Sequence, residues 1–120
     1  RTIFIRSIAY ETVELTGQLI DLMQGYPASE DYNYIAVKLM HTKIVTKLAI
    51  INRHVEDPRM RIVNANFGLF IKEFFDILAM KADEIIDHKL MKELISDLIR
   101  SHSADINYLA ELTDIKKIKN

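Results

Sequence analysis

The scarcity of turn-forming residues constrains this chain more than any other feature. Its 120 residues include three glycines and two prolines. A protein built of β-strands needs a turn every ~8–12 residues, and this sequence lacks the residues that make such turns. Apolar side chains instead recur at steps of about 3.6 residues, the period of an α-helix, through most of the chain. The sequence therefore predicts an all-α protein.

Glycine, proline and small polar residues predict where the first two helices begin and end. We expect a first helix over residues 2–24, closed by Gly25 in the left-handed conformation and by Pro27. The second helix is expected to begin after Pro27 with Ser29 as its N-cap. It should run to about Val55, because the apolar spacing continues that far.

The third helix has the clearest start. Asp57 precedes a proline, which suits the first helical position, so the prediction is an N-cap followed by a helix over about residues 58–80. Because globular helices rarely exceed about 25 residues, we expect a break within residues 82–87. Either Asp83 or Asp87 could cap a fourth helix there.

A further break is expected at residues 101–105, with Ser101 or Ser103 as the N-cap of a last helix. The predicted fold is a bundle of four to five helices packed around the central hydrophobic helix at about 58–80. We expect residues 1–120 to form a single helical domain, either alone or as a fragment of a longer protein.

The predicted central helix has a wide apolar arc on a helical wheel. The arc consists of Val63, Phe67, Phe70, Ile71, Phe74, Phe75, Ile77 and Leu78. The stripe predicted for the fourth helix consists of Ile86, Leu90, Leu94 and Leu98. These two sets are the expected core of the second half of the chain.

Two helices carry more apolar residues than one buried face needs. Leu69 and Met80 lie on the far side of the third helix, and Ile35, Leu39 and Ile50 lie off the main stripe of the second. Surplus apolar surface usually marks an interface. The leading functional hypothesis is a non-catalytic interaction or oligomerisation module, with these five residues at the contact with a protein partner or a second copy.

Phenylalanines concentrated in one helix suggest an alternative, a domain that senses or carries a small apolar molecule. Such a pocket would be lined by Asn64, Phe67, Gly68, Phe70 and Phe74. A helical regulator separated from its DNA-reading half would have this composition. The other reading of the same residues is ordinary core, with Gly68 at a close helix crossing and Asn64 bonded to a neighbouring helix.

Basic residues suggest a third hypothesis, a nucleic-acid accessory protein. Phosphate contacts would come from Lys43, Lys47, Arg53, Arg59 and Arg61. The formal net charge is −1, so any such contact would be local. The other reading of these residues is a solvated face.

Several kinds of chemistry are disfavoured by counting residues. The chain has no cysteine, which excludes disulfides, zinc–thiolate sites and thiol catalysis. Three isolated glycines cannot form a phosphate-binding loop, and the Glu-x-x-His motif of di-iron bundles is missing. We therefore expect no enzyme activity, cofactor or metal. The alternative is an enzyme whose site is assembled in three dimensions from scattered carboxylates and histidines. The lack of cysteine, of a membrane-spanning run and of a signal peptide favours the cytoplasm.

Overall fold

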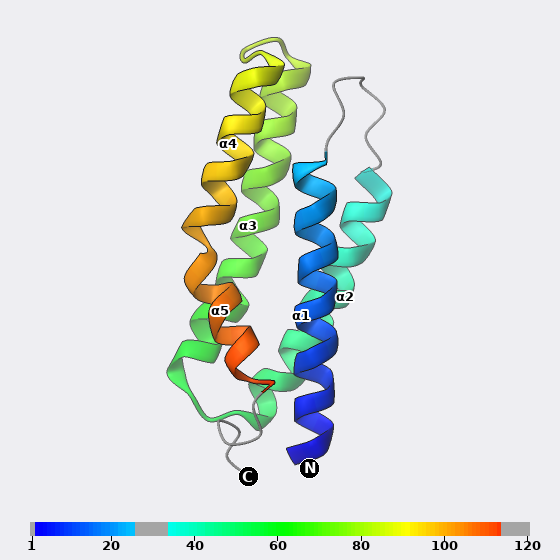
Figure 1. Ribbon diagram of the computed structural model, residues 1–120, viewed down its shortest axis with the longest axis vertical. Helices are drawn as coiled ribbons and strands as arrows, with labels where there is room; N and C mark the ends of the chain where they lie inside the picture. Colours follow the sequence, from blue (N-terminus) through cyan, green and yellow to red (C-terminus); the bar gives the residue numbers. More distant parts are fainter. Residues whose placement is uncertain (1, 26–33, 114–120) are drawn as a thin grey trace.

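Five α-helices form one up-and-down bundle in the computed structural model, which describes residues 2–25 and 34–113 (Figure 1). The helices are α1 (Thr2–Gln24), α2 (Tyr34–His54), α3 (Pro58–Ala82), α4 (His88–Ser101) and α5 (Ser103–Glu111). No β-strand occurs in these described residues. The prediction of an all-α bundle is confirmed.

The first four helices lie along the long axis of a body that measures 50 × 22 × 18 Å. α1 packs against α2, and α3 packs against both α2 and α4 (Figure 1). The short α5 turns away from the end of α4 and packs on α1 and α3. α3 therefore contacts three of the other four helices, and so does α1, which packs on α2, α4 and α5.

The core is formed mainly by the helix faces that the sequence predicts. Its buried apolar residues in α3 are Met60, Val63, Phe67, Phe70, Ile71, Phe74, Ile77 and Leu78. In α2 the buried apolar residues are Val37, Ile44, Leu48 and Ile51, Met40 is partly buried, and Val55 follows just after the helix. α1 adds two buried polar residues, Thr12 and Thr16. Each hydroxyl donates a hydrogen bond to the backbone carbonyl four residues before it.

Two aspartates cap helices at their N-termini. The Asp57 carboxylate accepts a hydrogen bond from the Arg59 backbone amide at 3.0 Å, and Pro58 occupies the first turn of α3 as predicted. Asp87 accepts from the Leu90 amide at 2.8 Å at the start of α4. The break predicted at residues 82–87 is therefore confirmed, with Asp87 as the cap.

Two of the predicted helix ends differ from the structure. Gly25 does not adopt a positive φ; its amide simply continues the helical pattern by donating to the Asp21 carbonyl at 2.8 Å. Neither Ser101 nor Ser103 caps α5. The break between α4 and α5 consists of the single residue His102, whose side chain makes no capping hydrogen bond. The predicted cap Ser29 lies outside the described residues.

The core stripe of α4 lies one position from the predicted one. Met91, Ile95 and Leu98 are buried, whereas Leu90 is exposed, Leu94 is half-buried and Ile86 precedes the helix. Each set is apolar at helical spacing, so periodicity alone could not choose between them. The consequence is that Leu90 and Leu94 are displaced toward the surface of the bundle.

The turn between α3 and α4 carries a left-handed residue that is not glycine. Glu84 has a φ of 59°, and its amide donates to the Lys81 carbonyl. The next amide, from Ile85, reaches the Met80 carbonyl at 2.9 Å, which completes a Schellman motif. A side chain at this position is strained, since the left-handed region favours glycine.

We expect Glu84→Gly to raise the free energy of unfolding by about 1 kcal/mol, because it removes this strain. Urea unfolding measures the change. The matched control is Glu93→Gly, at an exposed position inside α4, which should lower stability by about 1 kcal/mol. Equal losses in the two variants would contradict a strained Glu84.

Substitution of Phe74 tests whether α3 lies at the centre of the bundle. Its side chain is 0% exposed, so Phe74→Ala should cost about 3–5 kcal/mol of stability through lost contacts and a cavity. Leu69→Ala, on the exposed side of the same helix, should change stability by about 0.5 kcal/mol or less. Thermal and urea unfolding would show two similar losses if α3 were not the centre of the bundle.

Candidate functional site

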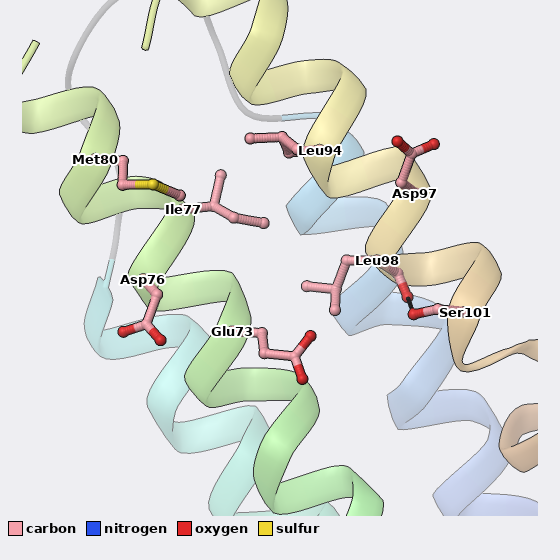
Figure 2. A pocket seen from close by; sticks show the side chains of 8 residues that line it. All are labelled: Glu73, Asp76, Ile77, Met80, Leu94, Asp97, Leu98 and Ser101. Atoms are coloured by element: carbon pink, nitrogen blue, oxygen red, sulfur yellow. Dashed lines mark hydrogen bonds between the residues drawn. The ribbon is translucent and has the colours of Figure 1, made fainter. Parts of the chain in front are cut away.

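A groove between α3 and α4 is the candidate functional site (Figure 2). Its volume is about 430 Å³. The residues that line it are Glu73, Asp76, Ile77, Met80, Leu94, Asp97, Leu98 and Ser101. Four of them come from each helix, so the site exists only where the two helices pack together.

The spacing of the residues in each helix explains why they meet. Glu73 and Met80 are two turns apart on α3, with Asp76 and Ile77 between them. Residues three, four and seven positions apart share one face of an α-helix. Leu94 and Ser101 have the same spacing on α4, and this face lies opposite the first one (Figure 2).

The floor of the groove is apolar and continuous with the core. Ile77 and Leu98 are buried members of the core. Met80 and Leu94 are half-buried above them and point across the groove from opposite helices (Figure 2). A second apolar side chain could extend this packing, since the floor remains partly open to solvent.

The rims of the groove are acidic. Asp76 accepts a hydrogen bond from Lys72 at 3.1 Å on the outer side of α3, and Arg100 pairs with Asp97 on α4. Glu73 forms no ion pair within the described part of the chain, and its carboxylate is turned toward α4 (Figure 2). The groove thus combines an apolar floor with one uncompensated carboxylate and two others already paired.

Exposed leucines extend the apolar surface past both ends of the groove. Leu69 is 52% exposed and lies one turn before Glu73 on the same face of α3. Leu90 is 40% exposed and lies one turn before Leu94 on α4. Because the two helices are antiparallel, these two leucines lie at opposite ends.

A polar cluster at the other end of the bundle connects α3 with α5. The Tyr108 hydroxyl donates to the Asp57 carboxylate at 3.2 Å, and Arg59 donates to the same carboxylate at 3.1–3.2 Å. The Arg59 guanidinium also lies 4.6 Å from the centre of the Tyr108 ring and 3.7 Å from Glu111. One carboxylate thus holds the beginning of α3 against the last helix.

The environment of this cluster shifts two pKa values. Hydrogen bonds from the backbone and side chain of Arg59 lower the pKa of Asp57, because they stabilise the charged carboxylate. Burial, together with the negative charge of Asp57, raises the pKa of Tyr108 to about 12. Both shifts keep Asp57 charged and Tyr108 protonated at neutral pH, and these are the states in which Tyr108 donates its hydrogen bond to Asp57.

His102 and Asp105 form a second contact between these helices. His102 Nδ1 is 3.2 Å from the Asp105 carboxylate, which also accepts a hydrogen bond from Asn66 at 3.2 Å. The imidazole packs 4.8 Å from the ring of Phe70. Within the described residues no serine or threonine hydroxyl bonds to His102, so the pair lacks a nucleophile and joins α3 to α5.

A cavity of about 410 Å³ lies beside these two contacts. It is lined by Arg59, Ile62, Val63, Ala104, Asp105, Asn107, Tyr108 and Glu111. Its charged groups already have partners in the same chain, since Arg59 pairs with Glu111 and Asp105 bonds to Asn66 and His102. It is therefore a weaker candidate for binding than the α3–α4 groove.

Of the five predicted interface residues, Met80 lines the groove and Leu69 extends it. Ile35 and Leu39 are 71% and 57% exposed on the outer side of α2. Ile50 is partly buried and packs against the core. The predicted set therefore separates into two surfaces, one on α3 and one on α2, with Ile50 in neither.

The residues predicted to line a ligand pocket lie mainly in the core. Phe67, Phe70 and Phe74 are at most 2% exposed and line neither the groove nor the α5 cavity. Gly68 is exposed, with no atom close enough to indicate a tight helix crossing. Asn64 is half-buried, and its Oδ1 accepts no hydrogen bond from the described residues.

The predicted phosphate-binding residues are dispersed. Lys47 pairs with Glu11 at 2.6 Å, and Arg59 is held in the α5 cluster. Lys43, Arg53 and Arg61 are exposed on α2 and α3. Two of the five cations are therefore already occupied by carboxylates of the same chain.

Residues 2–25 and 34–113 contain no group of three or more histidine, aspartate or glutamate side chains able to hold a metal ion. Within these ranges no helix has both the length and the apolar character needed to cross a membrane. Comparison with protein families, curated proteins and solved structures finds no match to this chain.

Sequence reasoning missed the contribution of α4 to the site. The apolar spacing places Leu94 in the predicted core stripe, and no motif marks Asp97. The available signal was the excess of apolar positions in α4, where Leu90 and Leu94 accompany Met91 and Ile95. Only one of two adjacent apolar stripes on a helix can face the core, so the other lies at a surface.

Tyr108 provides a test of the α5 cluster. In a pH titration followed by tyrosinate absorbance, Tyr108 should ionise near pH 12, above the ordinary 10.0. Because the folded state favours the neutral phenol, its contribution to stability is complete below pH 10 and is lost as pH rises through about 12. Tyr108→Phe should remove this step, and the exposed control Tyr10→Phe should not. An identical alkaline step in both variants would contradict the assignment.

Proposed function

We propose that this chain is a non-catalytic protein–protein interaction module whose α3–α4 groove receives a helix of its partner. The observation that carries the proposal is the partly open apolar floor between two acidic rims. Grooves of this kind bind amphipathic helices, which insert apolar residues spaced three, four and seven positions apart. A regulatory role and a cytoplasmic location are part of the proposal, the latter supported by the absence of cysteine.

The dimensions of the groove suit about two turns of helix. Glu73 and Met80 are seven residues apart, which corresponds to about 10 Å along α3. Leu69 and Leu90 add apolar surface at the two ends, so a longer helix would gain further contacts. A partner that covered all four leucine and methionine side chains would remove most of this exposed apolar surface from water.

The other two hypotheses have less support. A ligand pocket formed by Phe67, Phe70 and Phe74 would require the core to open, since all three side chains are almost fully buried and the rings of Phe67 and Phe70 pack on each other. A nucleic-acid contact would have to use Lys43, Arg53 and Arg61 without the two cations that are already paired. Binding of a helix in the groove requires neither an opened core nor the release of paired cations.

The proposal predicts that helical peptides, selected from a displayed library randomised on one face, bind at the groove. Leu94→Gln should weaken binding of the selected peptides at least about tenfold, because it places an amide on the apolar floor. Fluorescence polarisation with a labelled peptide measures the affinity. Met80→Gln tests the opposite wall in case Leu94→Gln unfolds.

Ile85→Gln is the matched control, since Ile85 is exposed in the α3–α4 turn outside the groove. It should leave peptide affinity unchanged. The proposal fails if no peptide is enriched, or if the selected peptides bind the groove variants as tightly as the original chain. Circular dichroism establishes that each variant is folded.

A further inference from the structure

We propose that the occupant of the groove is α2 of a second copy of the same chain. This inference rests on the proposed function and names its partner. The surface concerned, called the α2 face below, consists of Ile35, Lys38, Leu39, Thr42 and Lys43. Each copy would then offer one groove and one α2 face, and the protein would associate with itself.

The centre of the α2 face is apolar and exposed. Ile35 and Leu39 are four residues apart, so they lie one above the other on the same side of the helix. Their exposed fractions, 71% and 57%, are among the largest of any apolar residue in the described chain. Thr42 continues the row, and its hydroxyl is already bonded to the Lys38 carbonyl at 2.9 Å. This row presents two adjacent apolar anchors.

Lysines flank the apolar row on both sides. At about 100° per residue, Lys38 lies about 60° to one side of Ile35 and Lys43 about 80° to the other. Both are exposed, and Lys43 forms no ion pair with the described residues. Lys38 Nζ lies 5.7 Å from the centre of the Phe75 ring. The α2 face is therefore a short cationic amphipathic surface.

The two surfaces are complementary in charge pattern and in length. The groove has an apolar floor between acids on α3 and α4, and the α2 face has an apolar row between two lysines. Ile35 and Lys43 are eight residues apart, about 12 Å, against about 10 Å from Glu73 to Met80. Docking the row on the floor would bring a lysine to Glu73, the unpaired acid of the α3 rim, where opposite charges attract. The acid of the α4 rim, Asp97, is already paired with Arg100.

The contact has to form between copies. α2 packs on α1 and α3 through its opposite side, which carries Val37, Ile44 and Leu48. In Figure 1 α4 and α2 lie on opposite sides of the bundle, so the groove cannot receive α2 of its own chain. Because the two surfaces differ, repeated contacts produce rings or open chains. The average mass should therefore rise with concentration.

The same contact would also cover apolar residues that the bundle leaves at its surface. Leu69 and Met80 border the groove, while Ile35 and Leu39 form the α2 face. One contact between copies would cover both sets. Since the lysines and acids involved are exposed, the association should weaken as salt is raised.

The test is sedimentation velocity of the full chain over a range of concentrations at low and high salt. Self-association is expected, with Glu73→Lys and Lys43→Glu each raising the apparent dissociation constant at least about tenfold. Neither residue has an ion pair to lose within the described chain. Both side chains are exposed, so both variants should fold.

Mixing the two variants gives the decisive measurement. The Glu73→Lys copy keeps an intact α2 face, and the Lys43→Glu copy keeps an intact groove. An equimolar mixture should therefore recover association that neither variant shows alone. Contact of groove with groove, or of α2 face with α2 face, would instead leave one of the two variants associating like the original chain, because the altered residue of that variant would lie outside the contact.

Matched charge controls are Glu14→Lys and Arg61→Glu, which change the net charge equally at exposed positions outside both surfaces. They should associate like the original chain. The inference is overturned if the original chain stays monomeric, if the controls weaken association equally, or if mixing restores nothing. A monomeric chain whose groove still binds selected peptides would overturn this inference alone. A monomeric chain that also binds no selected peptide would overturn both this inference and the proposed function.

Discussion

Burial of one long helix by its neighbours determines the rest of this structure. α3 carries eight buried apolar residues, and three phenylalanines among them are almost wholly removed from water. Such aromatic side chains contribute a large share of the hydrophobic free energy of a small domain. α2, α4 and α5 each pack on α3, so the position of the groove depends on how α3 is covered. The groove lies where the cover from α4 is incomplete.

The parts of the fold that follow from local chemistry could be predicted from the sequence. The apolar arc of α3 is wide and unambiguous, and the Asp57–Pro58 pair gives its start. The register of α4 could not be predicted, because two adjacent stripes are equally apolar and only tertiary packing selects one. The left-handed turn at Glu84 gave no signal either, since the residue that normally marks such a turn is glycine.

The candidate site was partly predictable for a related reason. Leu69 and Met80 stood out because they are apolar residues on the wrong side of a helix whose core face was already complete. Their counterparts on α4 could be found only once the register was known. Contacts such as the one between Asp57 and Tyr108, 51 residues apart, depend on the path of the chain and have no local signature.

The hydrogen bond between Asp57 and Tyr108 also closes a loop of the chain. That loop contains all of α3 and α4, and therefore both walls of the groove. Holding the two ends of a segment together lowers its conformational entropy before anything binds to it. α5 thus holds the two ends of this segment together, in addition to the packing of α2 on α3 and of α1 on α4, and the groove is in effect formed in advance. A partner would lose less affinity to ordering the walls than it would if they were joined only by the α3–α4 turn.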